Sequence, residues 1–461
     1  MRYRHSILFA LAIAVTAIAI SFNGTGAADD ARTLQALVDK GGLVRLPKGV
    51  YRIATPIVVD LEKTGIVAIE GSTVARIIMT GPGPAIRFRG THAGTAAPHT
   101  VKPNVWDQRM PSVDGIEIVG EHPNAVGIEA TGTMKLTLTR VLIRDCLHGI
   151  HLIERNRNVI VSDCHIYNNR GIGLYLDNVN LHQINVTGSH ISYNADGGIV
   201  VKAGQVRNLQ ITGCDIESNM GKDRPPTANI LVDSTDGSNA EVAITGNTIQ
   251  HNHVAAGSAN IRIKGPSHLE PGTDERRDGH ITITGNILSD VMVNIHLDRV
   301  RGVVITGNTF WTAYDRNLLV ENCSNVIVGP NNFDRNPRYH REEKPETTNA
   351  ITFRNSSDCT LTGLHITGVR AAPAALTLEN CQRLHVTNCT ILDCDRIGIW
   401  IKNCTDTRLN GCMIRDDRPN AASLAIRVEG GRGNTIVNNL FGRPTEIALE
   451  SGTANANDAV K

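Results

Sequence analysis

The sequence predicts an all-β chain wound into a parallel β-helix, which is a solenoid of short strands. One observation is repetition: a phrase typified by Ile244-Thr-Gly-Asn247 recurs at spacings of mostly 22 to 25 residues, and self-similarity at such a period is typical of solenoids. A second observation is that apolar and polar residues alternate over short runs within each repeat, without helical periodicity, which favours strands. Each repeat therefore corresponds to one rung of three strands, and the chain holds about twelve rungs or more.

The apolar residue that opens the repeated phrase, here called the anchor, occurs once in each repeat. Its spacing lengthens only where a polar insert interrupts the pattern. The anchors are Leu138, Val161, Val186, Ile211, Ile244, Ile283, Ile305, Val328, Leu361, Val386, Leu409 and Val437. A tight turn follows each anchor, and in three consecutive repeats it carries Asn247, Asn286 and Asn308. We expect these side chains to form a hydrogen-bonded ladder along the solenoid.

The first 28 residues do not belong to the predicted solenoid. Arg2 and Arg4 precede an apolar run from Ile7 to Ile20, and small residues lead to Ala28. This order is typical of a signal peptide cleaved near Ala28. An uncleaved membrane anchor is the alternative, although the run is short for crossing a bilayer. We therefore expect a mature protein that is secreted, periplasmic or at the cell surface, with no membrane span once residues 1–28 are removed.

Residues 29–42 are expected to form a helix that caps the amino-terminal end of the solenoid. Asp29 and Asp30 can cap such a helix, an apolar stripe follows, and Gly41-Gly42 ends it. A cap is expected because the end rung of a β-helix leaves backbone groups unpaired. The β-helix is predicted to span residues 43–450, and the small, polar residues 451–461 are predicted to form a disordered tail.

The composition argues against nucleic acid as a partner and against a zinc-type metal site. Without Arg2 and Arg4 the chain has 44 basic and 45 acidic residues, so it lacks the basic excess that nucleic-acid binding requires. None of the ten cysteines lies in a Cys-x-x-Cys pair, so no zinc-type metal site is predicted.

The spacing of the cysteines follows the repeat. Cys381 and Cys404 are 23 residues apart, and so are Cys389 and Cys412. These pairs therefore occupy equivalent places in neighbouring rungs. Stacked buried thiols explain this at least as well as disulfides do, and both remain open at this point. Nothing in the pattern indicates an oligomeric state.

Two stretches near the amino terminus carry a family resemblance, Asp29–Leu37 and Gly41–Ile53, and the repeats extend it to about Leu449. The chain resembles the pectate-lyase-like superfamily, whose fold is a single-stranded right-handed parallel β-helix. This superfamily includes polysaccharide lyases, glycoside hydrolases, epimerases, esterases and non-catalytic adhesins, so the fold alone chooses no activity. Arg262-Ile-Lys264 matches a short motif of polygalacturonase-like hydrolases, but that family's Asn-Thr-Asp, Asp-Asp and Gly-His-Gly motifs are missing from the preceding strands, and no Asp-Pro-His-Asp motif of alginate epimerases occurs.

The third strand of each rung is expected to point alternate side chains away from the core. Reading one register through twelve repeats gives two outward columns. The first column is His151, Gly173, Val200, Leu231, Arg262, His296, Leu319, Thr352, Thr377, Trp400, Arg427 and Ala448. The second column is Ile153, Tyr175, Lys202, Asp233, Lys264, Asp298, Glu321, Arg354, Glu379, Lys402, Glu429 and Glu450. The mixed charges of the second column also fit a solvated sheet face held by cross-strand pairs.

Polar inserts single out the middle of these columns. Expanded turns occupy residues 219–227, 252–259, 266–279 and 333–349. Loops that flank a strand face form a groove, and loops on a rigid scaffold often carry function; neutral drift at a tolerant turn is the alternative for each insert. A further insert, residues 89–110, is expected to cover the amino-terminal end of the same face without a catalytic role.

Two mechanisms fit such a groove. In a polysaccharide lyase, a base removes the proton α to a uronate carboxylate, and a cation or metal neutralises that carboxylate. In an inverting hydrolase, two carboxyls flank the bond at about 6.5–9.5 Å. Asp233 and Asp298 lie two rungs apart, or about 9–10 Å, and Lys264 between them could lower the pKa of either.

The preferred function is a secreted carbohydrate-active protein, with a lyase acting on a uronate-containing polysaccharide favoured. The alternatives are an inverting glycoside hydrolase of the same fold and a non-catalytic surface or carbohydrate-binding β-helix. The candidate catalytic residues are Lys202, Asp233, Arg262, Lys264, His296 and Asp298. The candidate substrate-binding residues are Tyr175, Trp311, Tyr314, Glu321 and Tyr339, and the aromatic members are chosen because sugar rings stack on aromatic faces. The sequence assigns no cofactor, except that Asp233, Asp298 and Glu321 could hold Ca²⁺ in a lyase.

Overall fold

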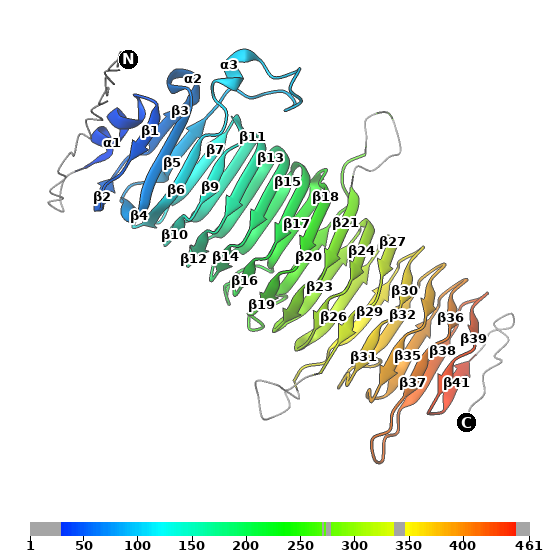
Figure 1. The fold of residues 1–461 in the computed structure, drawn as a ribbon. Helices are drawn as coiled ribbons and strands as arrows, with labels where there is room; N and C mark the ends of the chain where they lie inside the picture. Colours follow the sequence, from blue (N-terminus) through cyan, green and yellow to red (C-terminus); the bar gives the residue numbers. More distant parts are fainter. Residues whose placement is uncertain (1–28, 270–271, 273–277, 336–345, 449–461) are drawn as a thin grey trace, which may run out of the picture.

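The computed structural model describes residues 29–269, 272, 278–335 and 346–448, and it confirms the predicted fold class. In these ranges 41 strands pair in parallel within one continuous sheet. Figure 1 shows this sheet wound into an elongated solenoid, with helix α1 (Ala31–Val38) at one end and strand β41 (Thr445–Ala448) at the other. The predicted signal peptide, residues 1–28, and the predicted tail, residues 451–461, lie outside the described residues.

Three ladders of strands run along the solenoid, one for each strand of a rung. The third-strand ladder consists of β3 (Ile57–Asp60), β5 (Gly83–Arg89), β7 (Ala125–Thr131), β11 (His148–Ser162), β13 (Ile172–Thr187), β15 (Gly197–Thr212), β17 (Ala228–Gly237), β20 (Ala259–Lys264), β23 (Val291–Asp298), β26 (Ala313–Glu321), β29 (Ala350–Arg354), β32 (Leu376–Glu379), β35 (Ile397–Lys402), β38 (Leu424–Glu429) and β41.

The anchor strands form the second ladder, which the long strands β11, β13 and β15 join after turning a corner. Its other members are β1 (Gly42–Arg45), β4 (Val67–Met79), β6 (Ser112–Gly120), β9 (Thr137–Thr139), β18 (Ala240–Thr245), β21 (Gly279–Thr284), β24 (Arg301–Thr306), β27 (Ser324–Val328), β30 (Thr360–Thr362), β33 (His385–Thr387), β36 (Arg408–Asn410) and β39 (Thr435–Val437). The short strand β8 (Thr133–Met134) pairs with β11 at that corner.

The remaining strands form the third ladder, which β4 and β6 also join through their carboxyl-terminal halves. Its other members are β2 (Gly49–Ile53), β10 (Leu142–Arg144), β12 (His165–Tyr167), β14 (His190–Ser192), β16 (Asp215–Glu217), β19 (Thr248–Gln250), β22 (Ile287–Ser289), β25 (Thr309–Phe310), β28 (Asn332–Phe333), β31 (His365–Thr367), β34 (Thr390–Leu392), β37 (Met413–Arg415) and β40 (Leu440–Phe441).

The helix expected within residues 29–42 is present as α1. Its apolar stripe, Ala31, Leu34 and Val38, is buried against the first rungs. Two further helices are single turns, α2 (Leu61–Thr64) and α3 (Pro103–Trp106). None of the described helices is long and apolar enough to cross a membrane.

The inward side chains of the three ladders make one continuous apolar core from Ala31 to Phe441. Each of the ten cysteines is buried in it as a free thiol, which decides between the two interpretations of their spacing. Buried asparagine ladders run beside this core. The predicted ladder is confirmed: the amide of Asn247 bonds to Asn286, that of Asn286 to Asn308, and that of Asn308 to Asn331.

One anchor was predicted one residue too late. In β39 the partner of Leu409 is Ile436, not Val437, and Ile436 is the buried residue of the two. Both residues are β-branched and apolar, and no glycine marks the following turn in this repeat. Only the core position tells them apart.

Candidate functional site

The two predicted outward columns lie on the third-strand ladder with one correction near each end. In β13 the partner of His151 and Val200 is Tyr175, not Gly173, and the partner of Lys202 is Asp177. Tyr175 therefore belongs to the first column, whereas the second was predicted for it. At the carboxyl end Arg427 pairs with Glu446 and Glu429 with Ala448, each two residues before the predicted partner. A shift of two residues keeps every side chain on the same face, so alternation cannot detect it.

The columns from β20 to β35 form a continuous chain of hydrogen bonds and ion pairs, which we call the paired stretch. The first contact is a nitrogen–nitrogen distance of 3.3 Å between Arg262 and His296. The nitrogen–oxygen distances that follow are His296–Glu321 3.2 Å, Glu321–Arg354 3.0 Å, Arg354–Glu379 3.0 Å and Glu379–Lys402 2.8 Å. Each link joins side chains on neighbouring strands, about 4.8 Å apart. From Glu321 to Lys402 opposite charges are thereby paired at the surface, whereas Arg262 and His296 are joined by a hydrogen bond.

The side chain of Arg262 holds two of the predicted inserts in place through hydrogen bonds. It is only 9% exposed. Its Nη1 donates to the carbonyl oxygen of Thr227 at 3.0 Å, and its Nη2 donates to that of Gly257 at 2.5 Å. Burial lowers the pKa of this guanidinium from its ordinary value. Because both arms hold backbone carbonyls, Arg262 has a structural role that the sequence did not indicate.

His296 has both ring nitrogens engaged. Nδ1 lies 3.3 Å from the donor Nε of Arg262 and so accepts, which makes Nε2 the donor to Glu321. Burial and the charge of Arg262 lower the pKa of His296, so the neutral ring is favoured. This tautomer leaves no free lone pair to take a proton from a substrate.

The carboxylates predicted for catalysis or calcium are also occupied by cations. Asp233 lies 3.0 Å from Lys264 and accepts two further bonds from Thr235; burial raises the pKa of Asp233, but these bonds outweigh it and the net shift is downward. Asp298 pairs with Arg299 at 3.0 Å. Within the ranges that the structure describes, no group of three or more His, Cys, Asp or Glu side chains is arranged to hold a metal ion.

The amino-terminal part of the same face differs, and its residues His151, Tyr175, Asp177 and Lys202 are here called the open stretch. The ring of His151 stacks on that of Tyr175, with centroids 5.1 Å apart and planes inclined by 7°. Nε2 of His151 lies 3.2 Å from Asp177, whereas Nδ1 is 3.7 Å from the nearest oxygen of Glu129, beyond hydrogen-bond reach. His151 can therefore donate through Nε2 and keep a lone pair on Nδ1.

Lys202 is the exposed cation of the open stretch. It lies between Asp177 and Asp233 in the ladder, yet it forms no ion pair with any residue that the structure describes. The reason is that both neighbours have other partners, since Asp177 bonds to His151 and Asp233 to Lys264. The ammonium group of Lys202 is therefore available to an anionic ligand.

The surroundings of the open stretch keep its other groups neutral. Burial raises the pKa of the Tyr175 hydroxyl, and its hydrogen bond to Asp177 raises it further, so it stays protonated. Burial lowers the pKa of the neighbouring His148 to about 4, with a smaller effect of His151. Nδ1 of His148 accepts the backbone N–H of Ile172 at 3.1 Å.

The predicted aromatic residues do not line one surface. Trp311 is 7% exposed, so its ring is not accessible to a sugar. Tyr314 stacks on His253 with ring centroids 3.9 Å apart, far along the solenoid from Tyr175. Tyr339 lies outside the described residues. The structure thus brings Lys202 and Tyr175 together with His151 and Asp177, and it places Lys264, Arg262 and His296 in fixed pairs.

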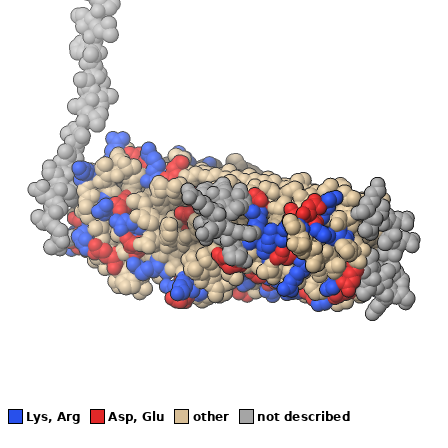
Figure 2. Space-filling model, turned by 90° about the horizontal axis from the view of Figure 1, so that it is seen from below, with Lys and Arg blue, Asp and Glu red and all other residues tan. Residues whose placement is uncertain are grey.

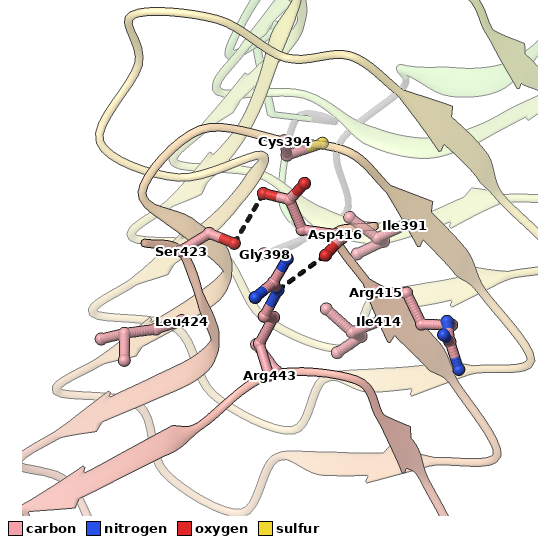
Figure 3. A pocket seen from close by; sticks show the side chains of 10 residues that line it. Ile391, Cys394, Gly398, Ile414, Arg415, Asp416, Ser423, Leu424 and Arg443 are labelled. Carbon is pink, nitrogen blue, oxygen red and sulfur yellow. Dashed lines mark hydrogen bonds between the residues drawn. The ribbon is translucent and has the colours of Figure 1, made fainter. Parts of the chain in front are cut away.

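One other face of the solenoid and one small cavity show no arrangement of side chains comparable to that of the open stretch. Figure 2 shows acidic and basic side chains interspersed over the face seen from below, with no continuous field of one sign. A small cavity lies among β34, β35, β37 and β38, far from the columns' middle (Figure 3). There Asp416 accepts from Ser423 at 2.7 Å and from Arg418 at 2.9 Å, which lowers its pKa to about 2, the bond from Arg418 having the largest effect. This is a satisfied internal cluster.

Asp177, His148 and Glu129 were not singled out by the sequence. Asp177 was missed because of the two-residue register error in β13. A usable signal was present: His148, His151 and Tyr175 crowd two successive third strands in a chain with only 4% Phe, Trp and Tyr.

Comparison with one solved structure supports the fold, and two others are weaker matches. The tailspike protein of E. coli bacteriophage HK620, solved with a pentasaccharide, matches 89% of this chain and 77% of its own at 14% identity, with a TM-score of 0.51. The A-module of the Azotobacter vinelandii mannuronan C-5 epimerase AlgE4 matches 94% of this chain and 97% of its own at 14% identity, with a TM-score of 0.43. PfbA, a surface adhesin of Streptococcus pneumoniae, matches 90% of this chain and 88% of its own at 13% identity, with a TM-score of 0.43. At these identities the likeness concerns the fold alone.

Sequence comparison adds two family models. Among curated proteins none matches this chain. A model described as "Right handed beta helix region" matches residues 112–249, which confirms the superfamily expected from the resemblance and its handedness. A model described as "Periplasmic copper-binding protein (NosD)" matches residues 226–458, half of the chain. By that match the protein belongs to the NosD family.

Proposed function

We propose that this protein is an exported polysaccharide lyase that acts on a uronate-containing glycan at the open stretch. The observation that carries the proposal is that Lys202, which has no ion-pair partner among the described residues, lies on the same strand face as a histidine two strands away that Asp177 orients. A lyase needs a cation against the uronate carboxylate and a base near the proton α to it. Lys202 and His151 supply these two groups on neighbouring columns of one exposed strand face.

The reaction would proceed by elimination. Lys202 neutralises the substrate carboxylate, which makes the adjacent C5 proton more acidic. Nδ1 of His151 takes that proton, the C5–H electron pair forms the C4–C5 double bond, and the C4–O bond to the leaving sugar breaks. The departing oxygen takes its proton from the Tyr175 hydroxyl, which regains one from solvent. Asp177 holds the imidazole in position and stabilises its charged form.

Residues further along the face would bind the polymer instead of reacting with it. Asp233 and Lys264 lie one and two rungs beyond Lys202, so a glycan chain following the ladder would pass over them. Export rests on residues 1–28 as a signal peptide and agrees with the periplasmic description of the family.

Copper binding, which the family description names, is not proposed for this chain. Copper prefers thiolate, thioether and imidazole ligands. The ten thiols are buried, and burial raises the pKa of Cys146, Cys323 and Cys394 to about 12, which disfavours thiolates. No suitable cluster of three donors occurs in the described ranges.

A non-catalytic glycan-binding β-helix is the second candidate, and the paired stretch favours it. A face whose charged and polar side chains bond to one another from Arg262 to Lys402 offers a flat polar surface without a reactive group. In that case the open stretch would bind an acidic sugar without cleaving it.

The test uses the purified chain without residues 1–28 on a panel of polyuronates and neutral glycans. A lyase yields products with an ultraviolet-absorbing unsaturated uronate, whereas a hydrolase yields reducing ends without that absorbance. We expect the unsaturated product from at least one polyuronate. Binding without any product across the panel would contradict the lyase and support the second candidate.

A further inference from the structure

A cluster of basic side chains occupies the corner where β11 and β13 turn from the third-strand ladder into the anchor ladder. Arg157 and His182 are register partners on these two strands, and Arg155 lies two residues before Arg157. The insert of residues 89–110 adds His92, held at this corner by the bond from its N–H to the carbonyl of Gly132 at 2.9 Å. We call Arg155, Arg157, His182 and His92 the basic corner.

Two members of the basic corner are almost completely buried. Arg157 and His92 are each 4% exposed. Nη1 of Arg157 donates to backbone and side-chain oxygens of Asn180 and to the carbonyl of Asn156, at 3.0 to 3.1 Å. Arg155 donates from Nη2 to the carbonyl of Gly94 in the insert. These bonds fix the guanidinium groups but bring no negative charge.

Two polar atoms of the corner are buried without a hydrogen-bond partner among the residues that the structure describes, Nε of Arg155 and Nε2 of His92. A buried donor or acceptor left unpaired costs about 1–3 kcal/mol. Such atoms are rare in native proteins, and an ion or water that completes them is a usual explanation.

The electrostatics of the corner are uniformly positive. Burial, with a smaller effect of Arg155, lowers the pKa of Arg157 to about 10. Burial also lowers the pKa of both His92 and His182 to about 4, and the other charged groups acting on them are all arginines, namely Arg155, Arg157 and, for His182, Arg207. Within the described ranges no carboxylate forms an ion pair with Arg155 or Arg157.

This contrasts with arginines elsewhere on the solenoid. Arg87 pairs with Glu129 at 2.6 Å and Arg144 with Glu117 at 2.9 Å, and Arg354 bridges two glutamates. Burying a charge without a counterion costs several kcal/mol. Arg157 is in this state and the partly exposed Arg155 beside it also lacks a carboxylate, so a negative charge from outside the chain would stabilise both.

We propose that the basic corner is a binding site for a compact oxyanion: a sulfate, a phosphate or the carboxylate of an acidic sugar. The planar guanidinium groups of Arg155 and Arg157 suit the oxygens of such an anion. Nε of Arg155 supplies an unused donor, and a protonated His92 or His182 supplies another. The site is distinct from the open stretch, since β13 carries Asp177 on one face of the solenoid and His182 beyond the next corner.

The experiment titrates the purified chain without residues 1–28 with sodium sulfate, sodium phosphate or sodium glucuronate by calorimetry at constant ionic strength. We expect saturable binding of at least one of the three, and the preferred anion identifies the source. Arg155→Gln should weaken binding by about tenfold or more, because one charge-assisted hydrogen bond contributes at least about 1.4 kcal/mol. Arg432→Gln, which alters an exposed arginine near the far end, should change nothing.

His182→Gln provides a second variant in case Arg155 cannot be replaced without unfolding. A bound anion raises the pKa of His92 and His182, so binding should tighten as the pH falls from about 7 to about 5, and His182→Gln should reduce this dependence. Absence of saturable binding by all three anions would overturn the proposal, as would equal affinity in Arg155→Gln and in the unaltered chain. Binding is measured without turnover, so this result is independent of the lyase proposal.

Discussion

The open stretch and the paired stretch lie on the same face of the same ladder, yet their charged side chains are arranged differently. From Arg262 to Lys402 each side chain of this chain of contacts is bonded to one on the next strand, and from Glu321 to Lys402 the partners carry opposite charges. At β11 to β15 this alternation fails, because Asp177 turns to His151 and Asp233 turns to Lys264, and Lys202 is left between them. The same scaffold thus engages its charged side chains with one another in one stretch and leaves an available cation two strands from an oriented histidine in the other.

The difference shows that charge density alone does not locate a site on a solenoid. Surface pairs contribute about 0–1 kcal/mol each and mainly hold the face together. A group becomes available to a ligand only where its neighbours are engaged elsewhere. Lys202 meets this condition, whereas Lys264, Arg354 and Lys402 do not.

Asp177→Asn is expected to have the largest effect, a loss of about 10²–10⁴-fold in turnover. The amide can donate to His151 and so favours the wrong tautomer, while the shape of the side chain is kept. The matched variant in the paired stretch is Glu321→Gln, which should leave turnover unchanged. Steady-state rates on the best polyuronate make this comparison, and equal losses in both variants would remove the distinction between the two stretches.

Arg262→Met should lower the free energy of unfolding by about 3 kcal/mol, because the carbonyls of Thr227 and Gly257 lose their charged donor in a buried setting. Lys202→Met, in the open stretch, should change it by less than about 0.5 kcal/mol. Urea unfolding followed by circular dichroism measures both. A smaller loss of unfolding free energy for Arg262→Met than for Lys202→Met would contradict the structural role assigned to Arg262.

Glu379→Gln should cost about 1 kcal/mol, since it weakens the bonds to both Arg354 and Lys402 at a partly exposed position. The side-chain bond from Lys402, with that from Arg354, holds the pKa of Glu379 below its ordinary value. This stabilisation is therefore present above the unfolded pKa and is lost as the pH falls through the lower folded value. Unfolding measured at low and high salt should show a smaller difference between variant and parent at high salt.

A pH dependence of stability is also expected near the open stretch. The folded pKa of His148 is lowered from 6.5 to about 4, so the unfolded chain binds the proton first as the pH falls. Stability should therefore decrease between about pH 6.5 and 4 and level off below that. His148→Gln should flatten this slope relative to His165→Gln, a control at an exposed histidine. An unchanged slope in His148→Gln would contradict the assigned burial.

The fold could be predicted from sequence because its signal repeats. Each rung restates the inward pattern and the turn asparagine, so the ladder at Asn247, Asn286 and Asn308 followed from spacing alone. The site could be predicted only in part. Lys202 and Tyr175 were included, but an even register shift hid Asp177, since it left every residue on its predicted face. The sequence also did not show which ion pairs form. A charged side chain in a column has a neighbour on each side, and only the structure shows with which of the two it pairs.

The most direct test of the account compares His151→Gln with His296→Gln in the assay for unsaturated uronate product. These histidines occupy the same outward column, one with Nδ1 unbonded and one with both nitrogens engaged. The account predicts a loss of at least about 10²-fold in turnover for His151→Gln and little change in turnover for His296→Gln, whose effect should appear in stability. A larger loss of turnover in His296→Gln than in His151→Gln would contradict it.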